Sequence, residues 1–88
     1  MTEERMRMIK EGLSELEPVS IKIEDEGHLH VGHAGAKSGG HFKLFIVSEH
    51  FRDMSYINRH KLIYKCLSDL MKTEIHALSI DAKVPEEL

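Results

Sequence analysis

The stretch HFKLFIVS, residues 41–48, decides the fold of this chain. In an extended strand Phe42, Leu44 and Ile46 lie on one face, while two further apolar side chains lie on the other. A strand that is apolar on both faces is typically central in its sheet or covered on both sides. We therefore expect this stretch to form the middle strand of the protein.

Two further strands are predicted on either side of it in the sequence. VSIKIED, residues 19–25, alternates apolar and polar residues, which indicates a strand with one buried face. A glycine-rich stretch from Gly27 to Gly40 separates it from the central strand. IHALSIDA, residues 75–82, is rich in small and β-branched residues and is predicted to be the third strand.

Helical spacing appears in two segments. Thr2 and the glutamates after it favour a helix start, apolar residues follow at intervals of three and four, and Pro18 predicts an end near Glu17. Ser55 is the expected cap of a second helix, whose apolar stripe extends to Met71. Pro85 predicts a last helical turn.

The resulting order is α-β-β-α-β. The first two strands can pair antiparallel, and the helix between the second and third permits a parallel pair with a right-handed crossover. We expect a single α+β domain over residues 1–88, with a three-stranded mixed sheet and the helices on one face.

Composition narrows the class of protein. The chain has 88 residues, 41% of them hydrophobic, and a net charge of −3, which is typical of a small globular domain. No apolar run suits a membrane span, and the N-terminus does not resemble a secretory signal. The single cysteine, Cys66, excludes an internal disulfide and fits a reducing compartment, so we expect a cytoplasmic protein.

The sequence offers no catalytic constellation. It has no nucleophile elbow and no phosphate-binding glycine motif. Cys66 falls within the predicted second helix, where a packing role is expected rather than a nucleophile. We therefore expect a protein that is not an enzyme.

Histidines are the best candidates for metal ligands. His28, His30, His33 and His41 lie close together in the sequence and offer neutral nitrogen donors, although a solvated loop would have the same composition. His76 shares a face with Leu78 and Ile80 in the third predicted strand. It is either a core histidine or a ligand, and the spacing alone leaves both interpretations open.

A short basic segment is the candidate for nucleic-acid binding. Arg59, His60, Lys61 and Lys65 lie near the start of the second helix, as in proteins that present a helix to DNA. A solvated helix face is the alternative, because the chain is acidic overall and binding to DNA depends on phosphate neutralisation.

Four segments together resemble the BolA family: IEDEGHLHVGH, HFKLFIVSEHF, INRHKLIYKCL and IHALSIDAKVPEE. The most specific pieces are RHKLIY, residues 59–64, and IHAL, residues 75–78. The resemblance implies a class II KH-like fold. The GxxG loop with which true KH domains grip RNA is absent from the sequence, and Gly40 replaces the hydroxyl residue that the family has before His-Phe.

The resemblance also implies a function. BolA-like proteins are associated with monothiol glutaredoxins that carry a CGFS motif, and with glutathione the two hold a shared two-iron two-sulfur cluster in iron–sulfur trafficking or iron regulation. Some bacterial members are described as transcriptional regulators of morphology and stress responses. Position by position, the family's C-terminal histidine matches His76, and its loop ligand best matches His30, with His33 as the competitor.

The expected partner is therefore a monothiol glutaredoxin, which would supply the sulfur ligands that this chain lacks. Alone, the protein is expected to carry no cluster and to be a monomer or weak homodimer. Two alternatives remain: a DNA-binding regulator that uses the helix around Arg59–Lys65, and a zinc module that uses the loop histidines.

Overall fold

The computed structural model describes residues 2–26 and 40–88. The helices are α1 (Thr2–Gly12), α2 (Tyr56–Cys66) and α3 (Ser68–Thr73), and the strands are β1 (Ser20–Asp25), β2 (Gly40–Val47) and β3 (Ile75–Lys83). Single 3-10 turns follow α1, β2 and β3, at Ser14–Leu16, Glu49–Phe51 and Pro85–Glu87. None of the helices in the described part has the length and apolar character needed to cross a membrane.

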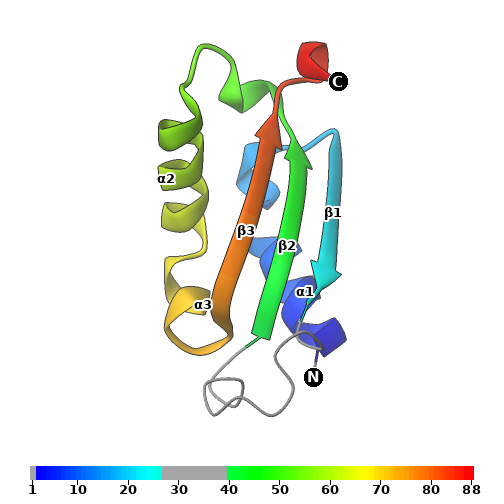
Figure 1. Ribbon diagram of the computed structural model, residues 1–88, viewed down its shortest axis with the longest axis vertical. Coiled ribbons are helices and arrows are strands. Elements are labelled where there is room, and N and C mark those ends of the chain that lie inside the picture. Colours follow the sequence, from blue (N-terminus) through cyan, green and yellow to red (C-terminus); the bar gives the residue numbers. More distant parts are fainter. Residues whose placement is uncertain (1, 27–39) are drawn as a thin grey trace.

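The three strands form one mixed sheet in the order β1-β2-β3 (Figure 1). β1 pairs antiparallel with β2, with Ser20 opposite Val47, and β3 pairs parallel with β2 on the other side. The prediction of a central strand at residues 41–48 is therefore confirmed, as are both pairing directions.

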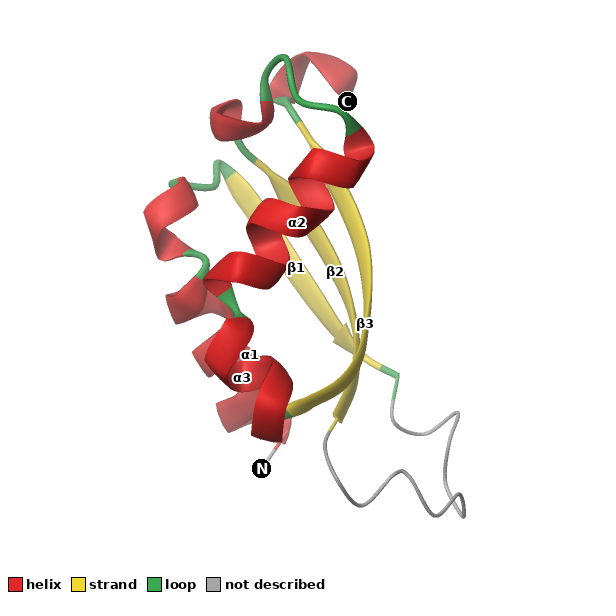
Figure 2. Ribbon diagram, turned by 90° about the vertical axis from the view of Figure 1, so that its left-hand side faces the viewer, coloured by secondary structure: helices red, strands yellow, loops and turns green. Residues whose placement is uncertain are grey.

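All three helices lie on one face of the sheet (Figure 2). The core forms between this face and the helices, and the even-numbered apolar residues of β2 point into it. Its fully buried members include Ile9, Leu13, Phe42, Leu44, Ile46, Phe51, Ile63 and Leu67. None of the helices α1, α2 and α3 lies on the opposite face (Figure 2). The α+β layer predicted from the sequence is therefore confirmed.

The two predicted helices are each broken once. The first ends at Gly12 and continues as a 3-10 turn, and the second divides at Leu67 into α2 and α3. The breaks lie against each other, because a Cβ on Gly12 would stand 2.9 Å from Cδ2 of Leu67. Close packing of the two segments at this point requires the small residue, and periodicity along either segment does not report it.

Two serines fix the ends of elements. The hydroxyl of Ser55 accepts a hydrogen bond from the backbone N–H of Asn58 at 3.1 Å, which confirms it as the cap of α2. Ser48 is fully buried at the end of β2. Its hydroxyl donates to the carbonyl of Leu16 at 2.5 Å and accepts from the N–H of His50 at 3.0 Å, which joins β2 to the segment after α1.

Candidate metal centre

Two histidines come together where β2 and β3 begin. Since these strands are parallel, their first residues lie at the same end of the sheet. The ring centroids of His41 and His76 are 4.9 Å apart, and the rings are tilted by 45°. Two residues far apart in the sequence thus form one pair of imidazoles.

An irregular register places His76 in this pair. Gly40 is opposite Ile75 and His41 is opposite Ala77, so β3 has one extra residue, His76, at this step. Such a bulge redirects a side chain at the end of a strand. The expectation that His76 shares the inner face of Leu78 and Ile80 is therefore wrong: those two residues pack against the core, whereas His76 is exposed.

Gly40 fits the same local geometry. A Cβ at this position would overlap the ring of Phe42, which is itself part of the core. With the Phe42 ring in this position, residue 40 must be a glycine. The hydroxyl residue that the family has here would require Phe42 to shift.

The imidazole pair lines a shallow pocket of about 340 Å³. The pocket lies at the edge of the described residues and combines ring nitrogens, a carboxylate and a small hydroxyl. Its lining consists of Glu26, His41, Phe42, His76, Ala77, Leu78 and Ser79. A group bound there would contact both histidines and the start of β3.

The spacing of the two rings suits a common metal ion. Two imidazoles on one tetrahedral ion have ring centroids roughly 5 Å apart, given metal–nitrogen bonds of about 2 Å. In the described part of the chain, no group of three or more His, Cys, Asp or Glu side chains could hold a metal. The pair supplies at most two donors, so a complete site needs ligands from elsewhere.

The predicted site residues divide into three groups. His76 is at the site, whereas His30 and His33 lie outside the described residues. His41 belongs to the cluster of four histidines noted in the sequence, but it is not one of the three predicted ligands His30, His33 and His76. His41 lies beside His76 because β2 and β3, which are far apart in the sequence, pair in parallel.

Cys66 does not contribute a thiolate. It lies at the end of α2, and desolvation by burial, followed by a hydrogen bond with Glu15, raises its pKa to about 11. A thiol with this pKa is protonated near neutral pH and is a poor nucleophile or metal ligand. The packing role expected from the sequence is consistent with this environment.

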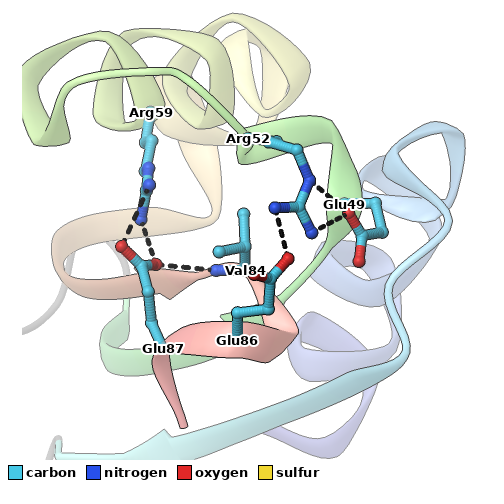
Figure 3. A network of polar contacts seen from close by, with 6 residues as sticks. All are labelled: Glu49, Arg52, Arg59, Val84, Glu86 and Glu87. Atoms are coloured by element: carbon cyan, nitrogen blue, oxygen red, sulfur yellow. Dashed lines mark hydrogen bonds and ion pairs between the residues drawn. The ribbon is translucent and has the colours of Figure 1, made fainter.

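The candidate nucleic-acid residues do not form one exposed surface. Lys61 and Lys65 are exposed on α2, and His60 is half-buried. Arg59 is 6% exposed and points inward (Figure 3). Its spacing of four and eight residues from Ile63 and Leu67 is the sequence signal that places it on the buried side of the helix.

Arg59 is bound at four points by its own chain. It donates to the carbonyl oxygens of Met54 at 3.0 Å and of Ala82 at 2.9 Å. It also donates to both carboxylate oxygens of Glu87, and the shorter of these two contacts is 2.7 Å (Figure 3). The guanidinium of Arg59, and then the N–H of Val84, lower the pKa of the Glu87 carboxyl. Arg59 therefore holds the segment after β3 against α2.

A second, exposed arginine lies beside this contact. Arg52 pairs with Glu49 at 2.6 Å and with Glu86 in the last turn (Figure 3). These hydrogen bonds raise the pKa of the Arg52 guanidinium. The end of the sheet opposite the histidines thus contains polar groups that bind one another.

Comparison with known proteins gives one consistent group. A family model described as BolA-like protein matches residues 13–87. Protein BOLA1, chloroplastic, of Arabidopsis thaliana is 43% identical over 97% of this chain, and the DNA-binding transcriptional regulator BolA of Escherichia coli is 36% identical over 83% of it and 72% of the relative. The solved BolA domain of SufE1 from Arabidopsis thaliana covers 97% of this chain and 95% of its own at 46% identity, with a TM-score of 0.83.

Some of these relatives are longer proteins. The chain spans 56% of the chloroplastic BOLA1 protein. It spans 24% of SufE-like protein 1, chloroplastic/mitochondrial, to which it is 42% identical over 94% of its own length. The match therefore covers only part of the length of those two proteins.

Proposed function

The chain belongs to the BolA-like family, and from this premise we propose that it is an adaptor that shares a two-iron two-sulfur cluster with a monothiol glutaredoxin and glutathione. In this role it acts in iron–sulfur trafficking or iron regulation in the cytoplasm. It binds and positions the cluster and catalyses no reaction of its own.

The observation that carries the proposal is the pair His41 and His76 beside a pocket without a thiolate. Two-iron two-sulfur clusters require four ligands, usually thiolates, and two imidazoles can replace two of them on one iron. The thiolates then come from the partner, for which a monothiol glutaredoxin and glutathione have the right chemistry. The donor set of the described residues thus fits a shared cluster better than a complete site of its own.

Three residues compete for the place beside His76. His41 is favoured by the ring distance of 4.9 Å, and His30 and His33 by the family pattern. All three offer a neutral imidazole, which carries less negative charge than a thiolate. A mixed cluster should therefore have a higher reduction potential and a different visible spectrum from a glutaredoxin homodimer.

The test mixes the protein with a monothiol glutaredoxin, glutathione, iron and sulfide and records visible absorption and circular dichroism. His76→Ala should abolish the mixed-complex spectrum and leave the free protein folded. Comparison of His41→Ala, His30→Ala and His33→Ala then identifies the second ligand. His50→Ala is the matched control, because His50 is an exposed histidine at the other end of the sheet. There its Nε2 atom lies 3.2 Å from Oε1 of Glu17.

Two results would count against the adaptor role. The first is a mixed spectrum that is unchanged in His76→Ala at unchanged stability. The second is tight zinc binding by the protein alone that needs the loop histidines but not His76. The second result would favour the zinc module, for which metal analysis of the isolated protein is the direct measurement.

DNA binding is the second candidate function, favoured by the name of the Escherichia coli relative and by the exposed Lys61 and Lys65. Arg59 contributes to it little, because its guanidinium is bound by Glu87. Titration with duplex DNA over a salt series tests it. Binding that prefers particular DNA sequences and is lost in Lys61→Ala and Lys65→Ala would support DNA binding as a function. Weak binding that occurs at low salt alone would show only nonspecific charge attraction.

A further inference from the structure

The two edges of the sheet differ in what lies beside them. At the β3 edge, α2 runs alongside, and the hydroxyl of Tyr64 donates to the carbonyl of Leu78 at 3.4 Å (Figure 1). At the β1 edge no described element runs alongside the strand (Figure 1). An open edge presents a row of backbone donors and acceptors that another strand can pair with.

Hydrogen bonding to β2 shows which residues of β1 face outward. The N–H of Glu26, the residue after β1, donates to the carbonyl of His41, which would be its partner if the register of β1 and β2 continued by one residue. Glu26 therefore lies at a hydrogen-bonded position of the ladder. Such positions alternate along an antiparallel ladder, so the backbone groups of Lys22 and Glu24 also point to β2. Those of Ile21 and Ile23 point to the open edge.

We propose that the open edge of β1 pairs antiparallel with the same edge of a second copy of this chain, about a two-fold axis at Ile23. Only odd-numbered residues present outward groups, so the hydrogen-bonded pairs across the axis must join odd residues with odd residues. This condition allows a two-fold axis at any residue of the strand. An axis at Lys22 or Ile23 pairs five residues of each copy, whereas an axis nearer to either end of the strand pairs three or fewer.

Charge selects one of the two longest registers and also disfavours the axis at Glu24. An axis at Lys22 places Lys22 opposite Lys22, and an axis at Glu24 places Glu24 opposite Glu24, both of which are unfavourable. An axis at Ile23 places Lys22 of each copy opposite Glu24 of the other. These residues already attract each other within one chain, where Lys22 Nζ lies 3.4 Å from a Glu24 oxygen, so the dimer would contain a ring of four alternating charges.

The apolar side of the strand supports the same register. Ile21 and Ile23 are half-buried and pack against the core, on the face opposite to Lys22 and Glu24. An axis at Ile23 brings the two Ile23 side chains beside each other, where each removes part of the other's exposed surface from water. Because the strand has six residues, the interface is small and the dimer should be weak and reversible.

The experiment is a charge exchange across the proposed axis, followed by sedimentation velocity over a protein concentration series. Lys22→Glu and Glu24→Lys should each raise the dimer dissociation constant at least tenfold, because like charges then meet at the axis. The double variant Lys22→Glu/Glu24→Lys should restore it to within about threefold of the original. Lys61→Glu, the same charge change on α2, should leave the dissociation constant unchanged.

Amide hydrogen exchange of the unaltered protein gives an independent readout. The N–H groups of Ile21 and Ile23 should exchange more slowly as the concentration rises, whereas those of Lys22 and Glu24 should be protected throughout by β2. A protein that stays monomeric at all concentrations overturns the proposal. A dimer whose dissociation constant is unchanged by Lys22→Glu also overturns it. The same holds if the double variant has an unchanged melting temperature but does not regain the original dissociation constant.

Discussion

The two ends of the sheet use polar side chains in opposite ways. Where the strands β2 and β3 begin, His41 and His76 line a shallow pocket. At the other end, Arg59 is buried and donates to Met54, Ala82 and Glu87. Arg59, which its own chain binds at four points, stabilises the fold, whereas His41 and His76 line a pocket that is open at the surface.

Removal of Arg59 should have the largest effect on stability. In Arg59→Leu two carbonyls lose their donor and Glu87 loses its partner. We expect the free energy of unfolding to fall by about 2–4 kcal/mol, measured by urea denaturation. Lys61→Leu, an exposed position on the same helix, should change it by less than about 0.5 kcal/mol; equal losses in the two variants would show that Arg59 is not structural.

Ser48 offers the next test of the same end. Its buried hydroxyl bonds both the carbonyl of Leu16 and the N–H of His50. We expect Ser48→Ala to lower the free energy of unfolding by about 1–2 kcal/mol in the same denaturation experiment. Ser79→Ala, at an exposed position of β3, should have little effect. A Ser48→Ala variant as stable as this control would contradict the role of Ser48 in joining β2 to the segment after α1.

The ion pair of Glu87 predicts a smaller, pH-dependent effect. Because Arg59 lowers the pKa of Glu87 in the folded protein, the pair contributes stability above the pKa of an unfolded glutamate, near 4, and loses it as the pH falls through the folded value. Between pH 6 and about pH 3 the melting temperature of Glu87→Gln should therefore fall less steeply than that of the original protein. Glu86→Gln, which removes only a contact to the exposed Arg52, should retain the slope of the original protein.

The opposite end should respond least in stability. His76 is exposed, so we expect His76→Ala to change the free energy of unfolding by less than about 0.5 kcal/mol. The same variant should remove the mixed-cluster spectrum, so stability and binding separate at this position. A loss of stability as large as that of Ser48→Ala would instead assign His76 to the fold.

Local patterns in the sequence predicted the elements and their order. Alternation identified β1, the two-sided apolar pattern of residues 41–48 identified the central strand, and Ser55 marked the start of α2. These signals depend on the period of side chains along one segment and on hydrogen bonds between near neighbours. The order of elements then restricts the connections, so the mixed sheet with helices on one face followed.

Contacts between distant segments decided the rest. The two helix breaks meet where Gly12 approaches Leu67. The burial of Arg59 removes it from the basic surface, and His76, the extra residue of β3, lies beside His41. The spacing of Arg59 from Ile63 and Leu67 is a local signal for its burial, but its partners are not local. The other two features depend entirely on how two distant segments are placed against each other. The sequence determined the strands, the helices and the family, while tertiary packing decided which polar side chains are bound inside the fold and which meet at the site.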